Sequence, residues 1–410
     1  MNRYVSAVLL VLILLPVVAL AQKTERQMDT AQYRTMIPEA KQGLLKNMSM
    51  IANMNFAFRN EFYDGAYTQS RFRNEQFRLE FRGQVTDKVF FRFRDRYTRA
   101  QTSESIDNIS RSVDMAYIRV DVSKKFSISA GKMCADWGAW EFDWNPIYIY
   151  EYSDIVEYAD NFLTGVGFTY TPSDKNQWTF QVLDSRTKSF EELYGQPPTF
   201  QESKAPLAFV ANWRGSLFDG RVKTIYSYSL FNEAQEVSHT DPSQLEPANM
   251  NYIALGNEFI VNDKFSFIYD FKWSDEQLDR TGIVTETIPD SLYGYAVSKT
   301  RYIGHWLHLR YRITPKVHFT FVGMMDISQW RNSHLDPGKP SSNTDNNIRT
   351  AWGFIPAVEW YPWKDLDFKF FANYVGRVYD YSDYAKSRFG AVDYSTGRFT
   401  IGFISPLGIF

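Results

Sequence analysis

The chain has 410 residues, a formal net charge of −2, a mean hydropathy of −0.38 and one cysteine. A nearly neutral chain lacks the excess of basic residues expected of a nucleic-acid-binding protein, and a single cysteine excludes an internal disulfide. Aromatic residues make up 17% of the sequence although the mean hydropathy is negative, so apolar and polar residues must alternate. This composition favours a β-rich protein over a bundle of membrane helices.

The first 21 residues have the organisation of an export signal. Arg3 supplies a positive start, residues 8–15 form an apolar run, and residues 19–21 (Ala-Leu-Ala) match an A-x-A cleavage signal. The apolar run is shorter than the ~20 residues of a membrane-spanning helix. We therefore predict a signal peptide over residues 1–21. The polar residues 22–47 form either a periplasmic extension or a luminal plug, and both alternatives stay open.

Alternating segments follow from Met48 onward, each of roughly the 9–11 residues that a tilted strand needs to cross a bilayer. In residues 48–62 one face is mostly apolar (Met50, Ala52, Met54, Phe56, Phe58 and Phe62) and the other is polar (Asn53, Asn55, Arg59 and Glu61). One face therefore suits hydrocarbon and the other suits water. This is the repeating unit of a transmembrane β-barrel.

Short polar turns alternate with longer polar segments along the chain. The turns are residues 86–88, 123–125, 172–176, 217–220, 262–264, 314–316 and 362–365. The longer segments include residues 98–112, 132–163, 231–249, 274–299 and 328–347. We predict an all-β fold over residues 48–410: a transmembrane antiparallel β-barrel of about sixteen strands, with short periplasmic turns and long outer loops. Such a barrel belongs in the outer membrane of a Gram-negative bacterium and has an aqueous lumen.

The hairpin over residues 77–97 carries an arginine at nearly every second position. A symmetric three-residue turn at 86–88 would place Arg82 opposite Arg92, Glu80 opposite Arg94 and Arg78 opposite Arg96. Opposed like charges are unfavourable by about 0.2–1 kcal/mol per pair unless water or anions lie between them. A water-filled lumen meets that condition and lipid does not. On the other face Asp95 points outward, which requires the headgroup region or a β-bulge.

The same alternation predicts a positive lumen. Counted over all strands, roughly fifteen inward cations stand against about eight inward acids. We expect pore-lining and anion-binding roles for Arg78, Arg82, Arg92, Arg94, Arg96, Arg119, Arg310 and Arg312. A positive pore raises the local concentration of small anions, the predicted solutes.

The segment 134–162 contains too many aromatic residues for a freely solvated loop. We predict that it folds into the lumen after the fifth strand and narrows the pore. The candidate constriction residues are Trp137, Trp140, Asp143, Trp144, Glu151 and Asp154. The acids of this segment, with Glu157, are expected to face wall arginines. The alternatives are packing over the barrel mouth and packing into a neighbouring subunit.

The last strand alternates Phe399, Ile401 and Phe403 outward and ends at Phe410. A terminal aromatic on an alternating strand resembles the signal by which bacterial outer-membrane proteins engage the barrel-assembly machinery. This machinery and outer-membrane lipid are therefore predicted partners.

Three stretches carry a resemblance to a known family. They are AGKMCADWGAWEFDWNPIYIYEYSD (residues 130–154), NFLTGVGFTYTPSDKNQWTFQVLDSRTKSF (residues 161–190) and FISPLGIF (residues 403–410). They resemble the phosphate-selective porin O and P family in its form common among Bacteroidetes. The resemblance implies a sixteen-stranded outer-membrane channel, often a homotrimer, in which an arginine ladder guides anions to a constriction. The implied function is passive diffusion of small anionic or polar solutes, phosphate among them.

Two other functions compete with a porin. A barrel filled by residues 22–47 or by the aromatic loop need not conduct, and would serve as a scaffold or as an accessory subunit of another outer-membrane complex. A barrel enzyme needs a base beside a nucleophile. Of five histidines only His308 and His318 are predicted to point inward, and His318 faces Arg312. We therefore predict no catalytic residues, and scattered histidines with one cysteine predict no metal site and no cofactor.

Overall fold

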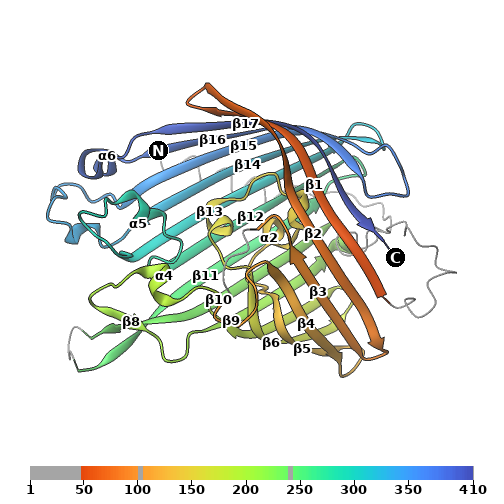
Figure 1. Ribbon diagram of the computed structural model, residues 1–410, viewed down its shortest axis with the longest axis horizontal. Coiled ribbons are helices and arrows are strands. Elements are labelled where there is room, and N and C mark those ends of the chain that lie inside the picture. The colour runs from red at the N-terminus through yellow and green to blue at the C-terminus, as the bar shows by residue number, and fades with distance from the viewer. Residues whose placement is uncertain (1–47, 100–104, 239–242, 410) are drawn as a thin grey trace. The chain divides into compact units, whose positions relative to one another are not determined.

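The computed structural model describes residues 48–99, 105–238 and 243–409, apart from the Leu335 side chain. The predicted signal peptide, the predicted extension or plug and Phe410 lie outside the described residues. Figure 1 shows the described chain as one large β-sheet with short helices in its connections. Among the described residues, no helix combines the length and the apolar character that membrane crossing requires.

Sixteen strands form the wall of a closed barrel. They are β1 (Met48–Tyr63), β2 (Ala66–Thr86), β3 (Val89–Arg96), β4 (Val113–Asp121), β5 (Phe126–Cys134), β6 (Phe162–Ser173), β7 (Asn176–Asp184), β9 (Leu207–Leu217), β10 (Val222–Val237), β11 (Leu245–Ile260), β12 (Phe265–Leu278), β13 (Ser298–Arg312), β14 (Val317–Trp330), β15 (Asn347–Trp360), β16 (Lys369–Tyr381) and β17 (Tyr394–Gly408). Each pairs antiparallel with its neighbours, and β1 also pairs with β17. The short strand β8 (Phe200–Glu202) pairs with β10 beyond the end of β9. Closure gives every wall strand a hydrogen-bonded neighbour on each side, as a lipid environment requires.

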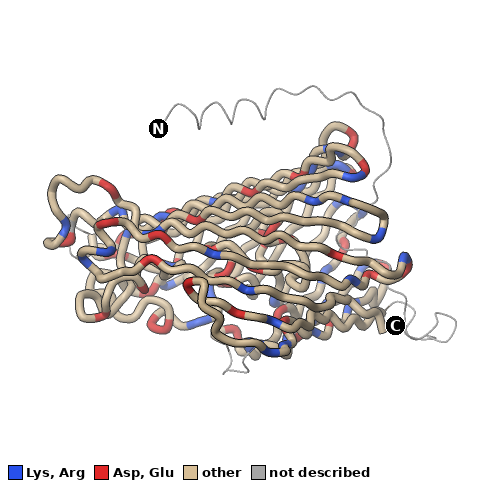
Figure 2. Tube along the Cα trace, turned by 90° about the horizontal axis from the view of Figure 1, so that it is seen from above, with Lys and Arg blue, Asp and Glu red and all other residues tan. Residues whose placement is uncertain are grey.

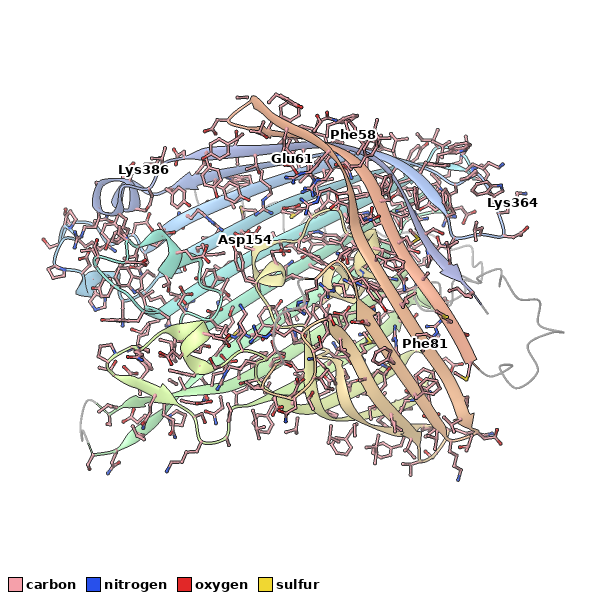
Figure 3. The ribbon with its side chains drawn as sticks, viewed as in Figure 1. Phe58, Glu61, Phe81, Asp154, Lys364 and Lys386 are labelled. Atoms are coloured by element: carbon pink, nitrogen blue, oxygen red, sulfur yellow. The ribbon has the colours of Figure 1, made fainter. Side chains whose placement is uncertain are left out.

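The connections contain short helices. These are α2 (Trp140–Asp143), η3 (Pro146–Tyr148) and α3 (Asp154–Glu157) between β5 and β6, then α4 (Phe190–Tyr194), η4 (Phe218–Gly220), α5 (Ile283–Thr287), η5 (Ser333–Leu335) and α6 (Asp383–Phe389). Figure 3 shows that Lys364, in the turn after β15, and Lys386, on α6, lie at opposite ends of the barrel. Lys364 marks the end with the predicted short turns, and Lys386 marks the end with long loops.

Side chains on the outer wall are predominantly apolar, as the alternation predicted. Phe399 and Ile401 of β17 are exposed, as are Phe93 of β3 and Ile118 of β4. The ring of Phe77 lies 5.5 Å from that of Tyr97, across the β2–β3 hairpin. A band of such residues is the surface that a barrel presents to hydrocarbon.

The structure corrects three details. The β2–β3 turn is not symmetric, because a register shift after Gln84 pairs Thr86 with Val89 and leaves Val85 without a partner. Most of residues 231–249, predicted as a loop, belongs to the long strands β10 and β11. The long-loop end also contains a tight turn, since Asp64 and Gly65 alone join β1 to β2.

Candidate functional site

The arginines of the β2–β3 hairpin gather around a first buried carboxylate, Glu80. The pairing of Arg78 with Arg96, of Glu80 with Arg94 and of Arg82 with Arg92 is confirmed by the strand register. Arg92 Nε lies 3.0 Å from the Glu80 carboxylate, Arg82 Nη1 at 3.7 Å and Arg94 Nη1 at 3.9 Å. The single carboxylate of Glu80 therefore lies at ion-pair distance from three guanidinium groups near the turn.

Asp114 is the second carboxylate, with a side chain that is 0% exposed. It pairs with Arg96 Nη2 at 2.7 Å, Arg94 Nε at 3.3 Å and Arg78 Nη1 at 3.4 Å. Simple alternation along β4 would place Asp114 toward lipid. A register shift between Arg94 and Asp95 inserts a β-bulge here, and the bulge brings the Asp114 carboxylate to the arginines.

Five guanidinium groups of this hairpin thus gather around two carboxylates, Glu80 of the hairpin and Asp114 of β4. The structure brings five of the eight predicted lining arginines together and leaves three apart. Arg119 pairs with Asp121 at 3.0 Å near the end of β4. Arg310 and Arg312 lie at the short-turn end of β13. Figure 2 shows that basic and acidic residues are distributed over strands, turns and loops of the barrel.

Residues 135–161, hereafter the inner loop, pack against the inside of the wall. Trp137 contacts Tyr252 of β11 with ring centroids 4.8 Å apart. Trp140 belongs to a buried cluster with Ile268 of β12 and Ile355 of β15. Packing against residues from several wall strands buries Trp137 and Trp140, which a solvated loop would leave in water.

Trp144 and the residues after it continue the same packing. Trp144 meets Trp306 of β13 edge-on at 5.7 Å. Further along, Asn145 Nδ2 donates to Asn53 Oδ1 of β1 at 3.0 Å, and the ring of Tyr150 lies tilted against that of Phe371 of β16, with centroids 5.0 Å apart. The inner loop therefore contacts strands on several sides of the barrel.

The acids of the inner loop pair with wall cations outside the β2–β3 hairpin. Asp143 lies 2.6 Å from Arg214 of β9, and Glu151 lies 2.9 Å from Arg398 of β17. Asp154, labelled in Figure 3, lies 2.7 Å from Arg377 of β16 and also pairs with Arg349 of β15. These three acids therefore pair with a part of the wall that lies outside the β2–β3 hairpin.

A buried pair that the alternation did not predict adds a further anchor. Glu141 of α2 pairs with Lys272 of β12, and both side chains are almost completely buried. Glu141 also accepts hydrogen bonds from Ser153 N and Ser153 Oγ at 2.6 and 2.7 Å. Ser153 precedes α3, so this single carboxylate joins both halves of the inner loop to the wall.

A cavity of about 490 Å³ lies between the inner loop and the wall. Its lining includes six cations, Arg78, Arg96, Arg99, Arg111, Lys132 and Arg398, and four acids, Glu75, Glu151, Glu157 and Asp160. Of the six predicted constriction residues only Glu151 lines the cavity, and the other five hold the loop in place. With six cations and four acids, the cavity lining has a formal excess of two positive charges.

Two acids of the inner loop in the cavity wall have pKa values that are shifted in opposite directions. Burial, followed by the neighbouring Glu151 and Glu141 carboxylates, raises the pKa of Glu157 above its ordinary value. Burial also acts to raise the pKa of Asp160, but the Arg280 guanidinium and hydrogen bonds from Thr187 outweigh it and lower that pKa. Of these two acids, Glu157 is thus the one that takes up a proton first when the pH falls.

Alternation missed residues that bulges and loops bring to the cavity. Glu75 reaches Arg59 at 3.1 Å from a second bulge, beside Asn55 and Phe56. Arg99 and Arg111 lie in the connection between β3 and β4, and Lys132 pairs with Asp107 of that connection at 3.0 Å. For the bulges, the available sequence signal was an acidic residue on an otherwise apolar face. The sequence carries no comparable signal for the loop residues Arg99 and Arg111.

The two inward histidines serve packing and hydrogen bonding. His308 stacks parallel to Trp306 at 5.6 Å and meets Trp144 edge-on at 4.7 Å. His318 lies opposite Arg312 in the register and 3.3 Å from Arg310 Nη2.

The sequence model of the phosphate-selective porin O and P family matches residues 52–404. Among solved structures, the outer membrane channel DcaP of Acinetobacter baumannii has a TM-score of 0.60 at 12% identity, covering 88% of this chain and 97% of that chain. An anion-selective porin from Comamonas acidovorans has a TM-score of 0.54 at 7% identity, covering 88% and 99%. At such identities the likeness is one of fold, and no curated protein matches the sequence significantly. The family match extends over most of the barrel, and the chain belongs to the phosphate-selective porin O and P family.

Proposed function

We propose that this outer-membrane porin is a passive channel with a preference for small anions. The single observation that carries the proposal is the inner face of the β2–β3 hairpin, where five arginines gather around the carboxylates of Glu80 and Asp114. Positive charge held in a cleft with low-dielectric walls raises the local concentration of anions. Inorganic phosphate, chloride and small carboxylates are solutes of the required charge.

Three acids of the inner loop pair with cations outside this hairpin. Asp143, Glu151 and Asp154 lie at ion-pair distance from cations of β9, β15, β16 and β17. The cavity beside them keeps more cationic than acidic side chains. The roles we propose are guidance of anions by the hairpin arginines and narrowing of the lumen by the inner loop.

A non-conducting scaffold is the competing function, and two observations disfavour it. The matched family consists of porins, and the inner loop leaves a polar cavity of about 490 Å³ instead of filling the barrel. Conduction is measured directly in the experiment that follows.

The test is the reversal potential of single channels in a planar bilayer under a KCl gradient. We expect the native protein to reverse on the chloride side. Changing Arg82, Arg92 and Arg96 to Gln leaves Glu80 with Arg94, and Asp114 with Arg78 and Arg94. The chloride-to-potassium permeability ratio should then fall about tenfold, the lower end of the enrichment that charged clefts produce.

The matched control changes Lys88, Lys124 and Lys125 to Gln. These three exposed lysines lie in the turns after β2 and β4, so the variant loses the same charge outside the barrel wall. Its reversal potential should equal that of the native protein. Equal reversal potentials for the two triple variants would exclude the hairpin arginines as the source of selectivity, and a native barrel without conductance would favour the scaffold.

The remaining partners are proposals of the same kind. We propose a homotrimer, surrounded by outer-membrane lipid, whose assembly uses the C-terminal Phe410. The resemblance to the form common among Bacteroidetes stays a prediction.

A further inference from the structure

A neutral polar surface lies on the cavity wall beside the cations. We call it the amide patch, and its members are Asn55 of β1, Gln76 of β2, Asn373 of β16 and Thr400 of β17. Asn55 lies opposite Gln76 in the strand register, and Asn373 lies opposite Thr400. The strand pairing therefore fixes the patch in place.

Three members of the amide patch are buried, and each has one side-chain oxygen that forms no hydrogen bond with the described residues. Asn55, Asn373 and Thr400 are 5%, 4% and 4% exposed. Among the described residues, none hydrogen-bonds to Asn55 Oδ1, Asn373 Oδ1 or Thr400 Oγ1. Buried polar atoms of this kind cost free energy unless another molecule satisfies them.

The unpartnered atoms distinguish between classes of anion. An amide oxygen only accepts hydrogen bonds, so it needs a ligand that donates them. Chloride has no donor, and inorganic phosphate near neutral pH carries only one or two O–H groups, on the same phosphorus whose oxygens the arginines would hold. A ligand that satisfies the patch must carry O–H or N–H groups in addition to its negative charge.

Cations stand directly beside the amide patch. Gln76 Oε1 accepts a hydrogen bond from Arg78 Nε at 3.1 Å, and Arg398 lies two residues from Thr400 on the same face of β17. Phe162 and Phe371 add apolar surface to the same cavity. Its volume of about 490 Å³ falls within the range of about 300–1,000 Å³ typical of small-molecule sites.

We infer that the cavity binds monosaccharides that carry a phosphate or a carboxylate group. The anionic group is held by the arginines and the sugar hydroxyls donate to the amide patch. This inference rests on the proposed anion channel and adds a solute class to it. A neutral sugar lacks the first interaction, chloride lacks the second, and inorganic phosphate has no hydroxyl groups apart from those of its anionic group.

The experiment measures how strongly four solutes block the chloride current of single channels. The solutes are glucose 6-phosphate, glucuronate, inorganic phosphate and glucose. In the native protein the two sugar anions should block at lower concentrations than phosphate, and glucose should have no effect. In the variant Asn373→Ala/Thr400→Val, half-block by glucose 6-phosphate should need an about tenfold higher concentration, from two lost hydrogen bonds. Block by inorganic phosphate should change less than twofold.

The control variant Thr68→Val/Asn74→Ala makes the same changes on the exposed part of β2. It should behave as the native protein does. Sugar anions that block no better than phosphate, or an Asn373→Ala/Thr400→Val variant that weakens all anions equally, would overturn the inference and leave the anion channel standing. A native channel without chloride preference would overturn both.

Discussion

At the scale of single residues, Asp114 has two effects of opposite sign. Its carboxylate is fully buried among Arg78, Arg94 and Arg96, and it subtracts one charge from the positive wall. The change Asp114→Asn keeps the shape but leaves three cations with less compensation. Removing one partner of a buried ion pair costs about 3–5 kcal/mol of folding free energy. We therefore expect a lower urea midpoint for the refolded barrel together with a stronger chloride preference.

The control for Asp114 is Asp121→Asn, the same change in a partly exposed pair with Arg119. Such pairs contribute about 0–1 kcal/mol, so its urea midpoint should remain near that of the native protein. A midpoint for Asp114→Asn equal to the control would show that the bulge does not depend on the carboxylate charge.

At the scale of elements, the inner loop is separable from the barrel that holds it. Lys272→Met leaves Glu141 buried without its cation, a loss of about 3–5 kcal/mol at this anchor. Local opening of the loop relieves that cost without unfolding the strands. We expect a larger and noisier single-channel conductance, with an unchanged urea midpoint for the barrel.

Lys386→Met on α6 is the charge-matched control, since Lys386 is half-exposed and pairs with Asp393 outside the lumen. The double variant Glu141→Gln/Lys272→Met removes both charges and should restore a quieter channel. Native conductance in Lys272→Met would mean that the Asp154 and tryptophan contacts alone hold the loop.

At the scale of the whole molecule, charge is sorted by position and responds to pH. The chain carries a net charge of −2, whereas the cavity lining has an excess of two cations. The raised pKa of Glu157 means that this carboxyl loses its charge at a higher pH than an ordinary glutamate. Anion preference should therefore increase as the pH falls from 7 to 5. The change Glu157→Gln should raise the preference at pH 7 and reduce its pH dependence.

Asp336→Asn is the control for this pH response. Hydrogen bonds from Arg388 lower the pKa of Asp336 to about 2, so its carboxylate stays ionised over the same pH range. This variant should keep the native pH profile. A Glu157→Gln channel that retains the full response would place the titrating group elsewhere.

The sequence predicted those features that depend on residues close together in the chain, and it did not predict features that depend on distant ones. Alternation depends only on neighbouring residues, so it predicted the barrel, the turns and the facing pairs Arg78–Arg96 and Arg82–Arg92. A β-bulge shifts that alternation by one residue, which is why alternation alone does not bring Asp114 and Glu75 to the inner face. A charged residue in a row that alternation assigns to lipid is a sequence signal for a β-bulge. Asp95 carries the same signal in the sequence.

The sequence by itself determined a closed barrel with an arginine-rich inner hairpin, because one face of each strand must suit lipid and the other water. Only the tertiary structure decided which charges cancel. It paired the inner-loop acids with Arg214, Arg377 and Arg398, and it brought the amide patch together from four strands at the two ends of the barrel sequence. Those contacts join residues up to several hundred positions apart, and they depend on barrel closure and loop packing, which no local pattern encodes.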